Sequence, residues 1–196
     1  MKTTALIPIT ILLAALPMSG QVPPIRTPPP ALLEVTLGYS TLRSNTIPGG
    51  CACFWMQGGK AEFQAALSSR IGLVSEIAGH HAHDINSAGE DLSLVSYLFG
   101  PRLSWRVRRF TPFVQTLIGG VHGFDAIFPS TNNSTVVPDA FAIAAGGGMN
   151  IALSRHLALR PFQLDYFLTD LPNNSANRQN SFRLGSGIVF KLSSRE

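Results

Sequence analysis

The stretch YLFGPRLSWRVRRFTPFVQTLIGG (residues 97–120) predicts two long strands joined by a short basic turn at Arg106–Arg109. Along the first strand, bulky apolar side chains alternate with small residues and a single charge. One face carries Tyr97, Phe99, Leu103 and Trp105, and the other carries Leu98, Gly100, Arg102 and Ser104. A soluble sandwich would turn its apolar face inward. Here the aromatic face is the larger one and the opposite face holds charge and glycine, which is typical of a membrane β-barrel with an apolar outside and a polar inside.

The composition agrees with this interpretation. Of 196 residues, 45% are hydrophobic and only 13% are charged. No stretch after the N-terminus reaches the roughly 18 apolar residues that a membrane helix needs. A barrel fits these values, and so does a secreted β-sandwich. The formal net charge is +4, but the basic residues are scattered, so we expect no nucleic-acid binding.

The N-terminus has the pattern of a secretory signal peptide over residues 1–20. Lys2 supplies the positive charge, Ala5–Leu16 is a short apolar region, and Met18–Gly20 ends in small residues suited to cleavage. A retained N-terminal anchor is the alternative. Residues 21–30, QVPPIRTPPP, are rich in proline, which locks φ and lacks a backbone N–H, so we expect an extended linker.

Residues 31–192 contain eight strand candidates, each about ten residues long, the length that a tilted strand needs to cross a bilayer. Residues 193–196 are left as a C-terminal tail. The candidates are Ala31–Leu42, Gly59–Ser68, Ile71–His80, Leu92–Trp105, Phe110–His122, Ala140–Leu153, Leu157–Leu168 and Phe182–Leu192.

The connections between these strands alternate in length. The long ones are Arg43–Gly58, His81–Asp91, Gly123–Asp139 and Thr169–Ser181, and the short ones are Ser69–Arg70, Arg106–Arg109 and Ser154–His156. Short periplasmic turns and long extracellular loops produce this alternation, whereas a soluble lipocalin-like barrel has no reason for it. The sequence therefore predicts an all-β fold, an eight-stranded antiparallel transmembrane up-and-down β-barrel.

The proposed inner faces carry acids and bases in equal number. An eight-stranded barrel has an interior just wide enough for side chains, so buried charges there must pair. We expect a lumen charge network, with Arg102 near its centre, made of Glu34, Glu62, Glu76, Arg102, Arg160, Asp165, Arg183 and Lys191.

One strand breaks the alternation. Arg160 does not share parity with Gln163 and Asp165. A β-bulge at Pro161 would turn all three side chains inward, because a bulge resets the alternation by one residue.

Several segments resemble the outer-membrane protein A-like β-barrel family, and more narrowly the stand-alone porin-family barrels built on its eight-stranded domain. They are YLFGPRLSW (97–105), FTPFVQTLIGG (110–120), AFAIAAGGGMNIAL (140–153), LALRPFQLDYFLT (157–169) and FRLGSGIVFKL (182–192). The resemblance covers about residues 31–192 and implies a bacterial outer-membrane location. It also implies insertion by the barrel-assembly machinery and contact with outer-membrane lipids and lipopolysaccharide. We expect a monomer.

Two groups of potential metal ligands fall in the predicted loops. Cys51 and Cys53 are too close in sequence for an unstrained disulfide, so unpaired or locally oxidised cysteines are favoured over a functional disulfide or metal ligation. His80 ends the third strand, and His81, His83 and Asp84 follow it in the second long loop. A solvated polar loop is favoured there, and the alternative is a zinc, copper or nickel site assisted by the cysteines.

A lipid A-modifying enzyme would need a nucleophile, a base and an acid at the rim of the barrel. His122, Asp125 and a nearby serine are the only conceivable set, and no family-specific spacing supports them. We expect no catalytic residues, no metal and no cofactor. The function predicted is structural or porin-like. Two alternatives remain. One is an adhesin or resistance factor that acts through its loops, since loops on a rigid scaffold carry function. The other is a lipid A-modifying enzyme.

Overall fold

The computed structural model describes residues 31–45, 53–83, 91–124, 128–129, 134–135, 139–171 and 178–194. The proposed signal peptide and linker lie outside this part of the chain, as do Cys51, Asp84 and Asp125. The described residues contain no helix long and apolar enough to cross a membrane. Their strands are β1 (Ala31–Asn45), β2 (Cys53–Ala66), β3 (Ile71–Ala82), β4 (Leu92–Ser104), β5 (Phe110–Phe124), β6 (Phe128–Pro129), β7 (Ser134–Thr135), β8 (Asp139–Ala152), β9 (Leu157–Thr169) and β10 (Gln179–Ser194).

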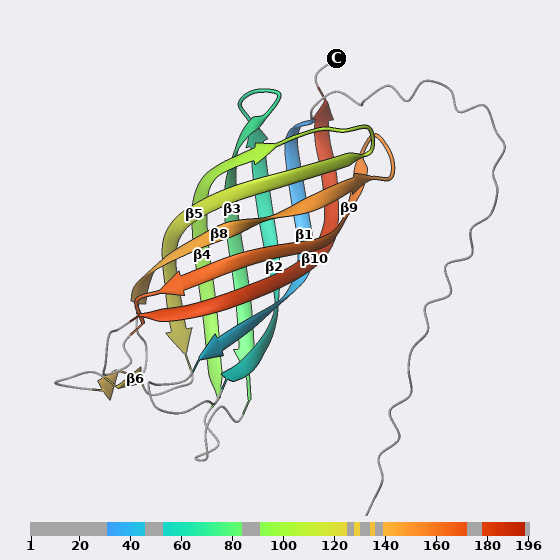
Figure 1. Cartoon of the computed structure of the whole chain (residues 1–196). Helices are drawn as coiled ribbons and strands as arrows, with labels where there is room; N and C mark the ends of the chain where they lie inside the picture. Colours follow the sequence, from blue (N-terminus) through green and yellow to red (C-terminus); the bar gives the residue numbers. More distant parts are fainter. Residues whose placement is uncertain are drawn as a thin grey trace, which may run out of the picture.

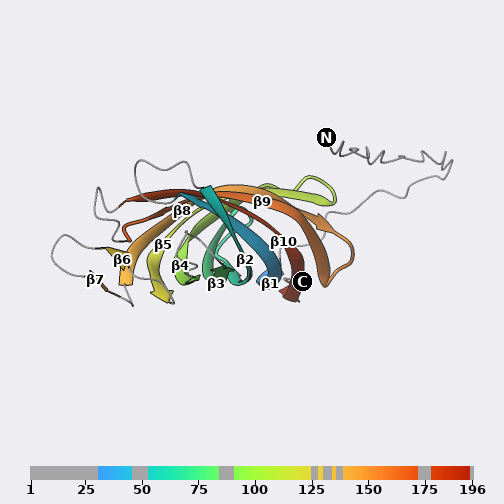
Figure 2. The same cartoon turned by 90° about the horizontal axis from the view of Figure 1, so that it is seen from below.

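Eight of these strands form a closed antiparallel barrel in the order β1-β10-β9-β8-β5-β4-β3-β2 (Figure 1). Each strand pairs with its neighbour in sequence, and β1 pairs with β10 to close the wall (Figure 2). The short strands β6 and β7 form a separate hairpin. The prediction of an all-β, eight-stranded, up-and-down barrel is confirmed. Closure pairs every strand of the barrel on both sides and leaves no open sheet edge.

The barrel has two different ends. We call the end with the tight connections 67–70, 105–109 and 153–156 the turn end, and the opposite one the loop end. Two of the turns use the same device, in which a serine hydroxyl accepts from the backbone N–H groups two and three residues later. Ser68 Oγ does so at 3.3 and 3.1 Å, and Ser154 Oγ at 3.2 and 3.0 Å. The third turn places Arg108 at a φ of 57°, in the left-handed region.

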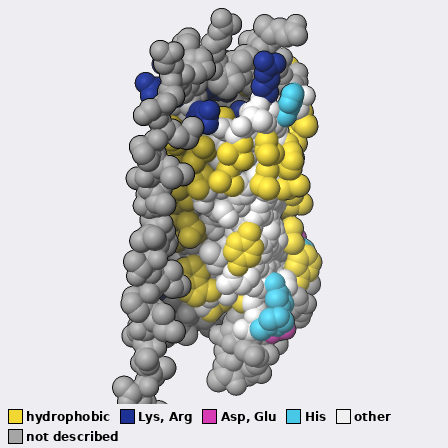
Figure 3. Space-filling view, turned by 90° about the vertical axis from the view of Figure 1, so that its right-hand side faces the viewer, with side chains coloured by type: hydrophobic (Ala, Val, Ile, Leu, Met, Phe, Trp, Pro, Cys, Tyr) yellow, Lys and Arg dark blue, Asp and Glu magenta, His cyan; other side chains and the backbone are white. Residues whose placement is uncertain are grey.

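The faces of the opening hairpin are as the sequence predicts. Tyr97 and Phe99 each expose 53% of their surface, whereas Arg102 exposes 1%. The same inversion continues around the wall, where each of the eight barrel strands carries exposed aromatic or aliphatic side chains. Figure 3 shows such side chains on one face of the barrel. Burying this outer surface in hydrocarbon would be favourable, and leaving it in water would be costly.

The second strand differs from its prediction. β2 begins at Cys53, not Gly59, so much of the loop expected over Arg43–Gly58 is strand, and β1 correspondingly runs on to Asn45. Gly58 and Gly59 concealed this, because they break the apolar alternation from which a strand is recognised. The structure instead uses Gly58 for close approach, since a Cβ there would strike the backbone of Gly79. The remaining strand ends move by zero to three residues, and β10 extends to Ser194, into the expected tail.

The bulge predicted in strand β9 is present. Pairing with β10 passes from Gln163↔Gly185 to Arg160↔Gly187, so two residues of β9 oppose one residue of β10. Pairing with β8 shifts at the same place. Pro161 and Phe162 are both exposed, and Arg160 and Gln163 are both buried. The bulge therefore turns the polar side chains on each side of it into the lumen.

Candidate functional site: the charged lumen

The lumen holds a connected set of charged side chains. Six of the eight residues predicted from the sequence meet there, all with 2% of their surface exposed or less: Glu62, Glu76, Arg102, Arg160, Asp165 and Arg183. They come from β2, β3, β4, β9 and β10, and the side chains reach across the interior between strands that are not neighbours. The period of two along each strand selects these positions, since every second side chain faces inward.

Glu62 on β2 has the most charged partners. Its Oε2 lies 2.7 Å from Arg102 Nη2 on β4 and 2.5 Å from Arg160 Nη1 on β9. Its Oε1 lies 3.0 Å from Lys60 Nζ. The sequence placed Arg102 near the centre of the network. In the structure Glu62 is surrounded by three cations, and Arg102 is one of them, with Lys60 and Arg160.

A second group continues from Lys60, whose Nζ also lies 3.7 Å from Glu76 Oε2. Arg183 then joins Glu76, at 2.7 Å from Nη1 to Oε1, to Asp165, at 2.9 Å from Nη2 to Oδ2. Glu62 and Glu76 face each other directly across the β2–β3 pair. Two like charges in that register repel, so the cation between them offsets the repulsion.

Lys60 is the charged residue that the sequence interpretation missed. It is 5% exposed and makes the inward cations more numerous than the predicted balance allowed. Its position two residues before Glu62 on one strand was a usable signal, because residues i and i+2 share a face.

Neutral side chains complete the arginine contacts. Arg102 donates to Gln64 Oε1 at 2.7 Å and also bonds Gln115, and Arg160 donates to Asn150 Oδ1 at 2.9 Å and Gln163 Oε1 at 2.7 Å. Amides on inward positions supply acceptors without adding charge, which suits a guanidinium with five donors.

The aromatic ring of Phe113 lies close to both guanidinium groups. The ring centroid lies 4.2 Å from Cζ of Arg102 and 4.7 Å from Cζ of Arg160. Both distances suit cation–π attraction, which is stronger where water is excluded.

Glu34 and Lys191, the other two predicted members, lie nearer the turn end. They face each other across the β1–β10 pair, and Glu34 is buried whereas Lys191 is half-buried. With Arg106 and Ser104 they line a small cavity of about 20 Å³. Gln64 and Asn150, which accept from Arg102 and Arg160, line the same cavity, so this polar mouth adjoins the buried centre.

The lumen changes character toward the loop end. Above the charges lies a buried apolar layer that the sequence did not predict, and its members come from seven of the barrel strands and the segment after β9. It includes Leu42, Met56, Ala82, Leu92, Leu94, Leu98, Leu117, Val121, Ala142, Ala144, Phe167 and Leu171. Apolar packing over a paired ionic layer leaves the interior filled with side chains, as expected for eight strands.

The three histidines at and just after the end of β3 face different sides of the wall. His80 faces the lumen, where its Nε2 lies 2.7 Å from Ser40 Oγ. His81 and His83 lie on the outer side of the loop end and form a group with Asp91. Cys53 is in β2 and Cys51 lies outside the described residues, so the help expected from the cysteines stays a prediction.

His122, the only candidate base for catalysis, is half-buried at the loop end. Its Nδ1 lies 2.5 Å from Asp139 Oδ1 on the neighbouring strand, and its ring packs edge-on against Phe124. The expected partner Asp125 lies outside the described residues. Within the described part of the chain, the side-chain contacts of His122 are thus an acid and an aromatic ring, and neither is a serine.

Comparison with known proteins identifies the fold. No family model matches the chain, and no curated protein matches it. Among solved structures, neisserial surface protein A (NspA) superposes with a TM-score of 0.66 at 10% identity, over 82% of this chain and 97% of that one. The chain has the fold of a small outer-membrane β-barrel.

Two further structures support the same fold. The outer membrane protein OprG of Pseudomonas aeruginosa superposes with a TM-score of 0.57 at 13% identity, over 83% of the present chain and 96% of the OprG chain. The attachment invasion locus protein Ail of Yersinia pestis superposes with a TM-score of 0.53 at 18% identity, over 81% of this chain and 97% of the Ail chain. The superpositions establish a shared outer-membrane barrel architecture. At identities this low, they do not transfer an activity from one protein to another.

Proposed function

We propose that this barrel is a closed structural protein of the bacterial outer membrane, which holds its loop end at the cell surface and conducts no solute. The observation that carries the proposal is the filled lumen. Three arginines with at most 1% exposure lie in the interior at the ionic layer, and nearer the loop end the buried apolar cluster occupies the lumen together with buried polar side chains such as Ser44 and His80. Any ion passing through would have to displace both layers.

The distribution of surface residues supports membrane insertion in a defined orientation. Apolar side chains cover the outer wall, and Figure 3 shows lysine and arginine atoms gathered near the turn end, beyond the apolar surface. Short turns in the periplasm and longer connections outside are the arrangement known for such barrels. We place the turn end in the periplasm, and we propose outer-membrane lipids, lipopolysaccharide and the barrel-assembly machinery as partners.

We also propose that the barrel is monomeric and not catalytic. The closed strand order supports the first point, because it leaves no unpaired strand edge to recruit a second copy. The contacts of His122 support the second, because Asp139 can orient an imidazole but supplies no hydroxyl nucleophile. Membership in the outer-membrane protein A-like family is a further proposal, supported by the shared fold and the strand segments quoted above.

Conductance in planar lipid bilayers tests the closed state. The refolded full-length protein should give no discrete channel steps under an applied voltage, with a protein-free bilayer as the baseline. An open porin reconstituted in the same lipid serves as the positive control. Reproducible steps from the wild-type protein would refute the closed lumen while leaving the barrel fold intact.

The loop end gives the second candidate function, an adhesin or resistance factor. A rigid barrel that fills its own lumen leaves the loop end as the part free to bind, and binding residues concentrate in loops on rigid scaffolds. The β6–β7 hairpin, which pairs Phe128 with Thr135, belongs to the longest of these connections. Cells carrying the barrel with residues 125–138 replaced by a short Gly-Ser linker should lose surface attachment if this function is correct, and unchanged attachment would contradict it.

A further inference from the structure

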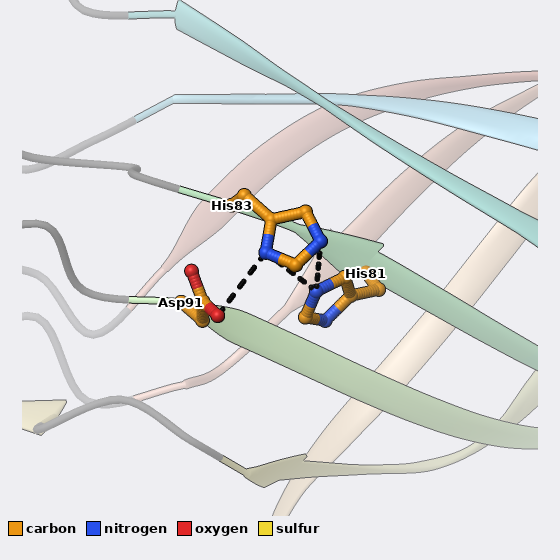
Figure 4. A group of neighbouring side chains, drawn as sticks. All are labelled: His81, His83 and Asp91. Carbon is orange, nitrogen blue, oxygen red and sulfur yellow. Dashed lines mark hydrogen bonds and ion pairs between the residues drawn. The ribbon is translucent and has the colours of Figure 1, made fainter.

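Three side chains converge at one corner of the loop end. His81 belongs to β3, His83 directly follows that strand, and Asp91 directly precedes β4 (Figure 4). The three can each offer one ligand atom, and these atoms all lie within 4.8 Å of one another. The pairing of β3 with β4, which places Ala82 opposite Leu92, brings the two ends of the hairpin together.

The spacing of the donor atoms suits a metal ion. His83 Nδ1 lies 3.2 Å from His81 Nε2 and 3.1 Å from Asp91 Oδ2. In a tetrahedral site with metal–ligand bonds of about 2.0–2.1 Å, neighbouring ligand atoms are separated by roughly 3.3 Å. His83 Nδ1 is therefore already near the required distance from both of the other donors.

A second observation concerns the orientation of the His81 ring. Its Nδ1 lies 2.8 Å from Ser93 Oγ on β4. A proton on Nδ1 donated to this hydroxyl leaves the lone pair on Nε2, the atom that faces His83. Metal-binding histidines usually have a hydrogen bond of this kind on the second ring nitrogen, because it fixes both the tautomer and the ring orientation.

The site is open to solvent, so an ion can enter, and three protein ligands leave one coordination position for another donor. The side chains of His83 and Asp91 expose 73% and 42% of their surface, so the site opens to the outside of the barrel. Three protein ligands around a tetrahedral ion leave one position for water or an external donor. Two imidazoles with one carboxylate form a set that suits zinc, copper or nickel better than magnesium or calcium.

We propose that His81, His83 and Asp91 bind a divalent transition-metal ion, with zinc as the reference ion, and that Ser93 positions His81 for it. The bound ion cross-links the end of β3 to the start of β4 at the cell-surface side of the barrel. His80, one residue before His81, takes no part because its side chain faces the lumen.

Isothermal titration of the tag-free, refolded full-length protein with ZnCl₂ tests the site. We expect one saturable site per chain. His83→Ala should weaken it at least tenfold, and Ser93→Ala, which removes no ligand, should also weaken it by about tenfold or more. Asp91→Asn should also weaken zinc binding, and CaCl₂ should give no saturable binding.

The matched control is His156→Ala, which removes an exposed histidine at the turn end and should leave zinc binding unchanged. Heat-modifiable migration on gels verifies that each variant is folded, and His83, being exposed, can be replaced without disturbing the lumen. Absence of one-to-one binding would overturn the proposal. So would wild-type affinity in folded His83→Ala, or an equal loss in His156→Ala, because the zinc would then sit elsewhere.

Discussion

Arg102 and Arg160 share one acceptor, Oε2 of Glu62, although they stand on strands β4 and β9. The guanidinium groups also share the ring of Phe113. Two cations held this close would repel each other without the carboxylate. Glu62 is consequently the residue on which the ionic layer depends.

Replacing Glu62 with glutamine should destabilise the barrel strongly. The change keeps the shape of the side chain but leaves Lys60, Arg102 and Arg160 without their common anion. Breaking a buried pair costs about 3–5 kcal/mol, because an uncompensated charge stays buried. Denaturant unfolding in lipid vesicles measures the loss.

The control for that variant is Asp170→Asn, which removes an exposed acid just after β9. Its free energy of unfolding should stay within about 0.5 kcal/mol of the wild-type value, as is usual for surface changes. If Glu62→Gln unfolds at the same denaturant concentration as this control, the paired-lumen interpretation is wrong.

Replacing Arg102 with methionine should cost less than replacing Glu62, because Glu62 keeps Arg160 and Lys60 as partners. A double-mutant cycle measures the coupling. In the Glu62→Gln background the same change should cost less still, since it removes one of the cations that repel each other, with a coupling of roughly 0.5–3 kcal/mol. Equal costs in both backgrounds would mean that Arg102 and Glu62 do not act as a pair.

Two glycines of the wall should respond differently to alanine. A Cβ on Gly100 would lie 2.1 Å from the carbonyl oxygen of Thr116 on β5, whereas a Cβ on Gly79 meets nothing within 4 Å. Gly100→Ala should therefore lower the free energy of unfolding by about 1–3 kcal/mol, the usual cost of overpacking. Gly79→Ala should cost nothing. The reverse order in vesicle unfolding experiments would contradict the described approach of β4 to β5.

Deleting Pro161 should be tolerated, which is unusual for a strand within a barrel. The deletion removes the extra residue of the bulge, so Arg160, Phe162 and Gln163 would alternate regularly opposite Gly187, Ser186 and Gly185. Every inward side chain of β9 stays inward. The variant should retain heat-modifiable migration.

Deleting Leu164 provides the contrast. With Asp165 held inward, that deletion turns Gln163 outward, because a shift of one residue exchanges the faces of a strand. We expect poor folding yield from this second variant. Equal yields from the two deletions would show that parity in β9 does not control assembly.

Some features follow from local sequence alone. Side chains alternate along any strand, so the inward position of Arg102 and the outward position of Tyr97 could be predicted without a structure. The same reasoning located the bulge, because Arg160 and Asp165 could both face inward only if one residue was extra. Where the local pattern weakened, as at Gly58 and Gly59, the predicted strand began too late.

Partnerships across the lumen could not be predicted in this way. The sequence interpretation predicted the members of the lumen charge network but not the pairs; in the structure Arg102 meets Glu62, and Glu76 lies against Arg183 and Lys60. Which inward side chains meet depends on strand tilt and stagger, which are properties of the closed barrel and not of any one strand. The apolar layer escaped prediction for the same reason, since its members are dispersed along the chain.

The sequence by itself determined the architecture, because a period of two with large apolar side chains on one face and charges on the other suits only a wall between lipid and a filled interior. The tertiary structure decided which groups meet. It placed Glu62 Oε2 between Arg102 and Arg160, and it brought His81 and His83 to Asp91 across the end of a hairpin. Such meetings depend on register and closure, which are set by all the strands together.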